Sequence, residues 1–250
     1  MTIDRWLPAL EARHLANLTR SELTRALRAL SSCYVERRDK LAGGAALEGA
    51  GKRAAFALFY APLHYLTIDA IVRALGAHER PLGTIHDLGC GTGAAGAAWA
   101  LAMRTPPAIA GIDRSAWAVA EAKWTYRQLG LRGTAKVGDI GRSPHFQIPT
   151  FPDSAILLAY AVNELPETSR ASLLERIAAA VAQGAPLLVV EPIAKRDRGW
   201  WPSWVSRLER AGVVEHEWRF PADIPGPLRD LARSAGLDPR ELTARTLSRF

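Results

Sequence analysis

Short apolar runs alternate with stretches of helical periodicity between residues 81 and 192, and this alternation constrains the fold more than any other feature of the chain. The predicted strands are the apolar runs at residues 84–88, 108–112, 134–137, 154–160 and 187–190. The predicted helices between them cover residues 94–103, 117–129 and 170–182. Because strands connected through helices run parallel, we expect an α/β fold with a doubly wound, mostly parallel sheet and helices on both faces.

The chain after residue 192 extends this pattern. Two further strands are predicted at residues 213–220 and 241–248, and two further helices at residues 203–211 and 227–235. The expected sheet is therefore seven-stranded.

The first part of the chain has helical rather than strand periodicity. Leucines recur at intervals of three to five residues from Leu7 to Leu30, which predicts an amphipathic helix or a broken pair of helices. Ser21 precedes the clearest periodic run and is the predicted cap of that helix.

A second helical region is predicted over residues 54–75. We expect it to break or bend near Pro62 and to end at Gly76. The change of periodicity that follows predicts a helical cap over residues 1–80 and a separate α/β domain over residues 81–250.

A glycine-rich loop, His86-Asp87-Leu88-Gly89-Cys90-Gly91-Thr92-Gly93-Ala94-Ala95-Gly96, follows the first predicted strand and opens a predicted helix. Glycines let the backbone turn tightly and approach a ligand, and a helix N-terminus favours a negative group. Two cofactor classes use such a loop. One is the dinucleotides, whose pattern is satisfied by Gly91-x-Gly93-x-x-Gly96 with Asp113 further along the chain.

The longer pattern, Asp87-x-Gly89-x-Gly91-x-Gly93, resembles class I S-adenosylmethionine-dependent methyltransferases, which have a Rossmann-like fold. The resemblance implies that the loop wraps the methionine part of S-adenosylmethionine and that the helix N-terminus faces its carboxylate. It implies cofactor-binding roles for residues at the ends of the first four strands of the domain: Asp87, Gly89, Cys90, Gly91, Gly93, Asp113, Arg114, Asp139, Ile140 and Ala159.

Two of these aspartates also have simpler interpretations. The resemblance implies that Asp113 binds the ribose hydroxyls, but Asp113 could also be a plain helix-entry residue. In the same way, Asp139 is expected to contact the adenine amino group, or else only to form a turn after Gly138. Cys90 is interpreted as a small spacer within the loop rather than as a nucleophile.

The candidate catalytic residues lie at or just after the end of the fourth predicted strand: Tyr160, Asn163 and Glu164. A general base is needed only if the methyl acceptor must lose a proton. Asn163 could instead cap the next helix, and Glu164 could be a solvated acid in its first turn. His64 and Tyr60 are further candidate bases if the N-terminal helices fold over the cofactor, and Glu191 is a candidate for orienting the acceptor.

The stretches 160–166 and 187–192 also resemble methyltransferase-like proteins associated with the small ribosomal subunit. Those proteins carry a cysteine cluster for a metal centre, whereas residues 193–250 contain no cysteine, so we expect no metal. Trp200-Trp201-Pro202-Ser203-Trp204 stands there instead. This segment could form an aromatic acceptor pocket, a stacking surface or a helix that packs its rings on the sheet.

Charge and composition restrict the partners and the location. The net charge of +7 is unevenly distributed, because residues 1–80 carry +4 (12 Lys and Arg, 8 Asp and Glu), residues 81–194 carry zero and residues 195–250 carry +3. The basic flanks could meet RNA, or could reflect an arginine-rich composition. Only Cys33 and Cys90 are present, which fits a reducing cytoplasm, and no apolar run reaches the roughly 18 residues expected of a membrane span.

The sequence therefore predicts a cytoplasmic enzyme that transfers a methyl group from S-adenosylmethionine to an RNA or small-molecule acceptor, with the small ribosomal subunit as a possible partner. The alternative from another class is a methyltransferase-fold factor without turnover that binds RNA or assists ribosome assembly.

Overall fold

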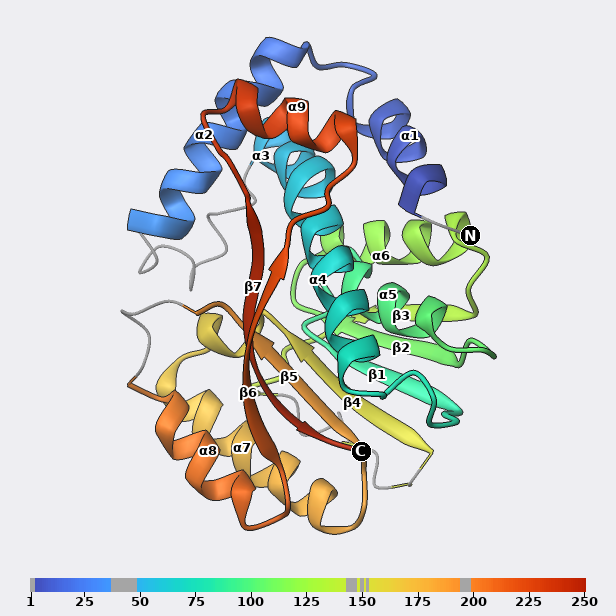
Figure 1. The fold of residues 1–250 in the computed structure, drawn as a ribbon, viewed down its shortest axis with the longest axis vertical. Coiled ribbons are helices and arrows are strands. Elements are labelled where there is room, and N and C mark those ends of the chain that lie inside the picture. Colours follow the sequence, from blue (N-terminus) through green and yellow to red (C-terminus); the bar gives the residue numbers. More distant parts are fainter. Residues whose placement is uncertain (1–2, 37–48, 143–147, 149–150, 152, 194–198) are drawn as a thin grey trace. The chain divides into compact units, whose positions relative to one another are not determined.

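The computed structural model describes residues 3–36, 49–142, 148, 151, 153–193 and 199–250 (Figure 1). The helices are α1 (Ile3–His14), α2 (Arg20–Glu36), α3 (Ala50–Ala55), the π-helical turn η3 (Phe56–Tyr60), α4 (Ala61–Ala74), α5 (Ala94–Ala102), α6 (Ala116–Gln128), the 3-10 turn η4 (Val162–Glu164), α7 (Glu167–Ala182), α8 (Trp201–Glu209) and α9 (Gly226–Ser234). The strands are β1 (Thr84–Leu88), β2 (Ala108–Asp113), β3 (Gly133–Val137), β4 (Ser154–Ala159), β5 (Leu187–Glu191), β6 (Val214–Pro221) and β7 (Glu241–Arg249).

The strands form one seven-stranded sheet in the order β3-β2-β1-β4-β5-β7-β6. The five strands from β3 to β5 in this order pair in parallel, whereas β7 pairs with β5 in the antiparallel sense. The prediction of a mostly parallel sheet with seven strands is confirmed. Because the order reverses between β1 and β4, the carboxyl ends of these strands border a crevice of the kind that binds ligands in open α/β sheets.

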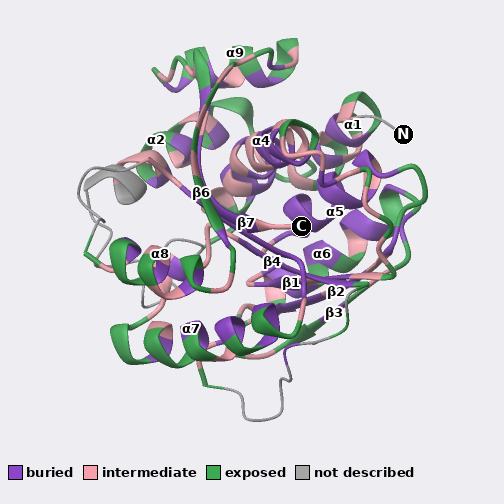
Figure 2. Ribbon diagram, turned by 60° about the horizontal axis from the view of Figure 1, so that its bottom comes forward, coloured by how far each residue is buried: buried purple, intermediate pink, exposed green. Residues whose placement is uncertain are grey.

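Helices cover both faces of the parallel part of the sheet. One face packs on α7 and α8 through a continuous core that includes Leu88, Ile156, Leu173 and Trp204. The opposite face carries α5 and α6, because Gly96 of α5 lies against Asp87 and Ile109. The central strands are consequently buried on both sides, as the burial colouring shows (Figure 2).

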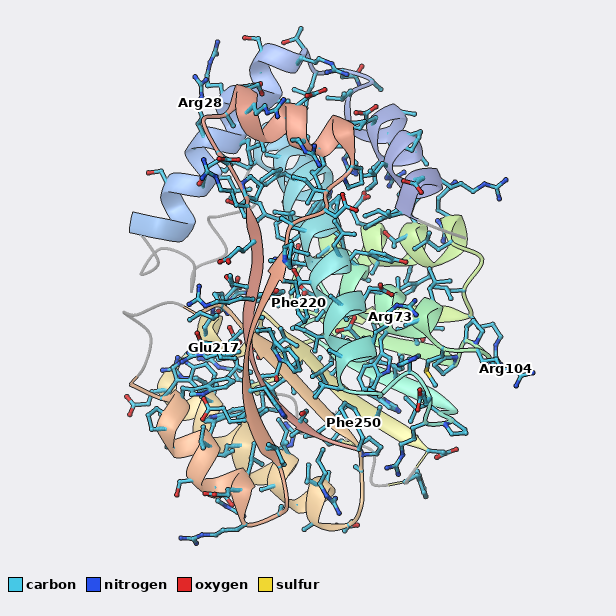
Figure 3. The ribbon with its side chains drawn as sticks, viewed as in Figure 1. Arg28, Arg73, Arg104, Glu217, Phe220 and Phe250 are labelled. Atoms are coloured by element: carbon cyan, nitrogen blue, oxygen red, sulfur yellow. The ribbon has the colours of Figure 1, made fainter. Side chains whose placement is uncertain are left out.

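The chain divides into two compact units, residues 1–66 with 220–242 and residues 67–219 with 243–250. This division differs from the predicted boundary at residue 80, because the segment that contains α9 belongs with the N-terminal helices. Within the first unit, the Arg28 guanidinium (labelled in Figure 3) donates to the Ser234 carbonyl at 2.5 Å, and the Thr24 and Ser234 hydroxyls are 3.0 Å apart. These contacts join α2 to α9 across 206 and 210 residues of sequence.

The N-terminus of α2 is capped by Thr19, not by Ser21 as predicted. The Glu22 backbone N–H donates to the Thr19 hydroxyl at 3.2 Å, and the Glu22 carboxylate accepts from the Thr19 backbone N–H at 2.8 Å. This reciprocal pair is a capping box, which requires Glu three residues after the cap. Ser21 has no glutamate at that spacing and lies inside the first turn of the helix.

The long helix from Ala50 to Ala74 is continuous, although a break or bend near Pro62 was predicted. The irregularity is the π-helical turn η3, which ends just before that proline. Proline cannot donate a backbone hydrogen bond, so a local shift in the hydrogen-bond register accommodates it. Gly76 is confirmed as the terminator: its φ is +67°, and the Ala77 N–H donates to the Val72 carbonyl at 2.9 Å.

This helix is long and apolar enough to cross a membrane by length and composition, with 61% of its most apolar window buried inside the protein. A buried core helix has the same properties, so the helix is weak evidence for a membrane span.

Candidate active site

Five strand ends bring polar side chains to one edge of the sheet within the second unit. The parallel register places Asp87 of β1 beside Gly111 of β2, and β5 pairs directly with β4. The residues at or just after these carboxyl ends are Asp87, Asp113, Asp139, Tyr160 and Glu191. The predicted site residues from the different strands therefore do meet at a common edge.

The glycine loop has a left-handed backbone at three positions. The φ angles of Gly89, Gly91 and Gly93 are +78°, +51° and +80°. A Cβ on Gly89 would lie 2.5 Å from the Ala161 Cβ, whereas a Cβ on Gly91 would meet no atom within 4 Å. The loop is thus closed against the protein at Gly89 and open at Gly91, the position where a ligand can approach its backbone.

Asp87 lies underneath this loop. The side chain has no exposed surface, and one carboxyl oxygen accepts from the Gly96 backbone N–H at 3.1 Å, which ties the strand end to the first turn of α5. Burial raises the pKa of Asp87 to about 7, the Gly96 N–H lowers it and Asp113 raises it further. This burial places Asp87 as a support for the loop, and its predicted contact with a cofactor stays a prediction.

Cys90 also points beneath the loop. A Cβ on Gly111 would lie 2.8 Å from the Cys90 sulfur and 3.2 Å from the Tyr126 hydroxyl, so the lack of a side chain at Gly111 makes room for both groups. Burial raises the pKa of the Cys90 thiol well above its usual range. A buried thiol of high pKa is a poor nucleophile, in agreement with the interpretation of Cys90 as a spacer.

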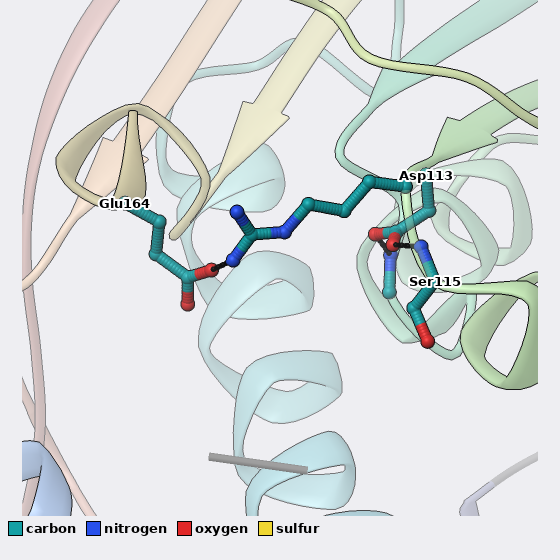
Figure 4. Close-up of polar contacts among 5 residues, drawn as sticks. Asp113, Ser115 and Glu164 are labelled. Atoms are coloured by element: carbon teal, nitrogen blue, oxygen red, sulfur yellow. Dashed lines mark hydrogen bonds and ion pairs between the residues drawn. The ribbon is translucent and has the colours of Figure 1, made fainter. Parts of the chain in front are cut away.

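Asp113 links the end of β2 to the glycine loop. One carboxylate oxygen accepts from the Gly91 N–H at 2.9 Å, and the other accepts from the Ser115 N–H at 2.8 Å (Figure 4). The cap of α6 is Ser115, whose hydroxyl accepts from the Ala118 N–H. Asp113 therefore lies at the entry to α6, two residues before its cap, and the helix-entry interpretation and ribose binding both stay open. Its half-buried carboxylate has lone pairs left for hydroxyl donors.

Arg114 and Glu164 form an ion pair between the ends of β2 and β4, with 3.4 Å between the guanidinium nitrogen and the carboxylate oxygen (Figure 4). The Glu164 side chain is 34% exposed. Its partial burial raises the pKa of Glu164 to about 7, while Arg114 lowers it and Asp113 raises it. A carboxyl group with such a pKa can exchange a proton near neutral pH.

Asn163 does not cap α7. That helix begins after Pro166 and has no side-chain cap, whereas Asn163 lies inside η4. The Asn163 backbone N–H donates to the Glu191 carboxylate at 3.2 Å. Asn163 therefore stays a candidate for the site, and its capping alternative is wrong.

Glu191 was a candidate for orienting the methyl acceptor. Its side chain is fully buried, so its carboxylate cannot touch an acceptor, and that interpretation is wrong.

Tyr160 is the non-glycine residue with positive φ in the described chain, at +59°. Burial raises the pKa of the Tyr160 phenol, and a hydrogen bond with Thr67 lowers it. Left-handed conformations of non-glycine residues are strained and often occur at functional sites.

Asp139, Ile140 and Ala159 complete the predicted cofactor residues. The exposed Asp139 carboxylate accepts from the Gly141 N–H at 2.8 Å, which forms the turn that was one of its two interpretations. That turn leaves the second carboxylate oxygen for an adenine, so both interpretations stand. Ile140 is 6% exposed and packs in the core, and Ala159, the last residue of β4, is half-buried.

The remaining base candidates, His64 and Tyr60, belong to the first unit. Both rings pack with Phe56, at centroid distances of 6.0 and 6.2 Å. Burial lowers the pKa of His64 to about 3, so the imidazole is neutral at physiological pH. Their catalytic roles stay predictions.

The tryptophan segment packs on the sheet. Trp201 is 4% and Trp204 1% exposed. For these two rings the burial agrees with the interpretation of a helix that packs its rings on the sheet. A cavity of about 440 Å³ lies beside Trp201. Its walls include Ile193, Val205, Glu215, Glu217 and Arg245. Glu217 is labelled in Figure 3.

Three contributors to the site were missed at the sequence level. They are Ser115, Tyr126 and Arg245. Ser115 is the cap of α6, and Tyr126 packs against Gly93, Gly111 and Gly133. Arg245 lies opposite Glu191 on β7. Ser115 had a signal, since serine is a common cap before a helix. The other two depend on tertiary packing. Among the residues that the structure describes, no group of three or more His, Cys, Asp or Glu could hold a metal ion.

Comparison with known proteins adds an independent finding. A family model described as a methyltransferase domain matches residues 85–184. The solved structure of the mitomycin 7-O-methyltransferase MmcR is similar at 17% sequence identity, over 97% of this chain and 71% of that one, with a TM-score of 0.54. No curated protein sequence matches the chain.

Two further solved structures cover less of this chain. A SAM-dependent methyltransferase from Aquifex aeolicus has 17% identity over 73% of this chain and 90% of its own, with a TM-score of 0.45. Magnesium protoporphyrin IX methyltransferase from Synechocystis PCC 6803, solved with bound SAH, has 16% identity over 74% and 82%, with a TM-score of 0.45. The narrower resemblance to the small-ribosomal-subunit proteins is not supported by these matches. The family model thus matches a methyltransferase domain over residues 85–184, and the likeness to MmcR shows a shared fold.

Proposed function

We propose that this protein is an S-adenosylmethionine-dependent methyltransferase. The observation that carries the proposal is the hydrogen bond from Gly91 to Asp113, which joins the glycine loop to the end of the neighbouring strand. This bond places the open backbone of the loop next to a half-buried carboxylate, and both belong to the segment that matches a methyltransferase domain.

The residues present fit the cofactor. The space above Gly91 would be filled by a Cβ at that position, and α5 begins directly after Gly93. The loop and this helix N-terminus would hold the amino-acid part of the cofactor, whose carboxylate the helix dipole attracts. Asp113 would accept hydrogen bonds from the ribose, and the exposed Asp139 carboxylate could accept one from the adenine amino group.

When bound, S-adenosylmethionine would supply an activated methyl group for transfer to an acceptor nucleophile, and S-adenosylhomocysteine would be the leaving group. The protein then mainly positions the acceptor and excludes water, and positioning can supply much of the acceleration. Glu164 can take a proton from the acceptor, because its raised pKa leaves a share of the carboxylate ionised at neutral pH and makes it a better base than an ordinary glutamate. Arg114 holds the Glu164 carboxylate in place.

We further propose a small-molecule acceptor. The cavity of about 440 Å³ beside Trp201 supports this proposal, because ligand pockets typically measure about 300–1,000 Å³. One of its walls, Ile193, lies two residues after the end of β5. A cytoplasmic location is part of the proposal, and the free Cys90 thiol is compatible with it.

Cofactor binding provides the test. Isothermal titration with S-adenosylhomocysteine should give a measurable Kd, and Asp113→Ala should raise that Kd at least tenfold, equivalent to about 1.4 kcal/mol. Asp139→Ala should raise it less if Asp139 contacts adenine, and not at all if it only forms a turn. A thermal shift with NAD but not with S-adenosylhomocysteine would reject the proposal in favour of a dinucleotide enzyme.

RNA is the second candidate acceptor, favoured by the charges of +4 and +3 on the two flanking segments. Binding of a labelled RNA whose affinity falls steeply with salt would favour it over a small molecule. If S-adenosylhomocysteine binds but no acceptor in an RNA, protein and small-molecule panel is methylated, the factor without turnover becomes the better description.

A further inference from the structure

Glu191 contacts the loop that carries the candidate catalytic residues. One Glu191 carboxylate oxygen accepts from the backbone N–H groups of Val162 and Asn163, at 2.9 and 3.2 Å. The side chain is fully buried, and its second oxygen has no hydrogen-bond partner in the described structure. A single buried oxygen therefore holds two consecutive amides of η4, directly before Glu164.

The segment before η4 needs such an anchor. Its first residue, Tyr160, is held at φ +59° and donates its backbone N–H to the Val190 carbonyl at 2.8 Å. A tyrosine in the left-handed region is strained, and it persists only where surrounding contacts determine the backbone. Those contacts come from the last two residues of β5. Val190 accepts from the Tyr160 N–H before η4, and Glu191 accepts from the first two N–H groups of η4 itself.

The neighbouring strand supports the Glu191 carboxyl group. Glu191 pairs with Arg245 across β5 and β7, so both side chains lie on the same face of the sheet. The Arg245 guanidinium carbon is 4.2 Å from the centroid of the Trp201 ring. Burial raises the pKa of Glu191 to about 8. The N–H groups of Asn163 and Val162 and the charge of Arg245 lower this pKa, and the charge of Glu164 raises it.

We propose that Glu191 is a positioning residue for methyl transfer: its buried carboxyl oxygen fixes the 160–164 loop and thereby sets the place of Asn163 and Glu164 at the acceptor side of the site. This inference rests on the proposed function. Glu191 has no surface toward a substrate, so it acts through the loop and not on the reacting atoms. The carboxyl group has to offer an accepting oxygen at this distance, and a negative charge is not required.

Two substitutions separate the accepting oxygen from the ability of the group to ionise. Glu191→Gln keeps an oxygen at the same distance and cannot ionise, whereas Glu191→Leu removes the acceptor and keeps a buried side chain of similar size. Glu191→Asp keeps the carboxyl group but shortens its reach by one methylene, and it serves as the second variant should the leucine variant fail to fold.

The first measurement is amide hydrogen exchange of Val162 and Asn163 in the full chain, resolved by NMR. We expect wild-type protection in Glu191→Gln and at least tenfold faster exchange in Glu191→Leu or Glu191→Asp. The second measurement is the titration of the Glu164 carboxyl carbon. Its pKa should keep its raised value in the glutamine variant and fall toward an ordinary value in the other two, because a released loop exposes Glu164 to water. A general loss of stability would not move this pKa selectively.

The Kd for S-adenosylhomocysteine should change less than threefold in Glu191→Gln, because this variant keeps the 160–164 loop in place and with it Ala161, which lies against Gly89 of the cofactor loop. Protected amides in the leucine and aspartate variants, or equal release in the glutamine variant, would overturn the anchoring role. Absence of S-adenosylhomocysteine binding in the wild-type protein would instead reject the proposed function and leave the exchange result intact.

Discussion

Single glycines determine how the cofactor loop is built, and Gly89 and Gly91 do so in different ways. Both have positive φ, so a side chain at either costs backbone strain of about 1–2 kcal/mol. At Gly89 the added Cβ would also lie 2.5 Å from Ala161. We expect Gly89→Ala to lower the melting temperature more than Gly91→Ala, since overpacking adds a further 1–3 kcal/mol or so, and calorimetry would measure the difference.

Ligand binding should depend more on Gly91, although Gly91→Ala destabilises the protein less than Gly89→Ala. Gly91→Ala places a methyl group in the open space above the loop, so it should abolish detectable binding of S-adenosylhomocysteine while the protein stays folded. Ala161→Gly is the matched control, because it should restore part of the stability of Gly89→Ala and none of the binding of Gly91→Ala. Full binding by Gly91→Ala would show that the ligand does not approach the loop there.

Among the elements, α2 offers a direct test of its observed cap. Thr19→Ala removes the hydroxyl that accepts from Glu22 and should destabilise the protein by about 1 kcal/mol, as other N-cap substitutions do. Ser21→Ala, at the position that the sequence favoured, should change the free energy of unfolding by less than about 0.5 kcal/mol. Urea denaturation followed by circular dichroism measures both variants. Equal effects of the two would contradict the capping box.

The strands were predictable because their signals are local. An apolar run such as Leu187–Glu191 is flanked by glycine, proline or charged residues, and its observed limits differ from the predicted ones by one residue. The return of α9 to the N-terminal helices was not predictable, because it depends on contacts between residues such as Thr24 and Ser234 that are distant in sequence. Periodicity reveals that a helix has an apolar face, but not which partner covers it.

The site was predictable in its composition and less so in its roles. A carboxylate at the end of β2 was expected to bind a ribose, and nothing in the sequence showed that Asp113 also fixes Gly91. Likewise, a polar residue at the end of β5 was expected to face a substrate. The depth at which Glu191 is buried follows from its pairing with Arg245 and from the loop folded above it. Sequence spacing places a residue at a strand end, while burial decides whether it meets a ligand or supports the loop.

For the molecule as a whole, buried ionisable groups link folding to pH. The pKa of Asp87 is raised from 3.8 to about 7 and that of Glu191 from 4.5 to about 8, chiefly by burial. Each group holds its proton more tightly in the folded state, so its contribution to stability is complete below the unfolded pKa and disappears as pH rises through the folded value. His64 has the opposite effect, because its pKa is lowered to about 3 in the folded protein. Its contribution to the free energy of unfolding decreases as pH falls below about 6.5.

These opposing groups make a comparison between variants more informative than one pH profile. The free energy of unfolding of the wild-type protein minus that of Glu191→Gln isolates Glu191, because all other groups cancel. This difference should fall between pH 5 and pH 8, by up to about 1.4 kcal/mol per pH unit, and level off above that range. Glu175→Gln is the matched control. Glu175 pairs with Arg207 at 2.8 Å and its pKa is lowered, so the difference between the wild-type protein and Glu175→Gln should stay flat over the same interval.

Denaturant titrations at each pH would measure both differences, and a flat profile for Glu191→Gln would mean that Glu191 is ionised in the folded protein throughout the range. The anchoring of the 160–164 loop would survive that result, because an ionised carboxylate accepts the same two hydrogen bonds.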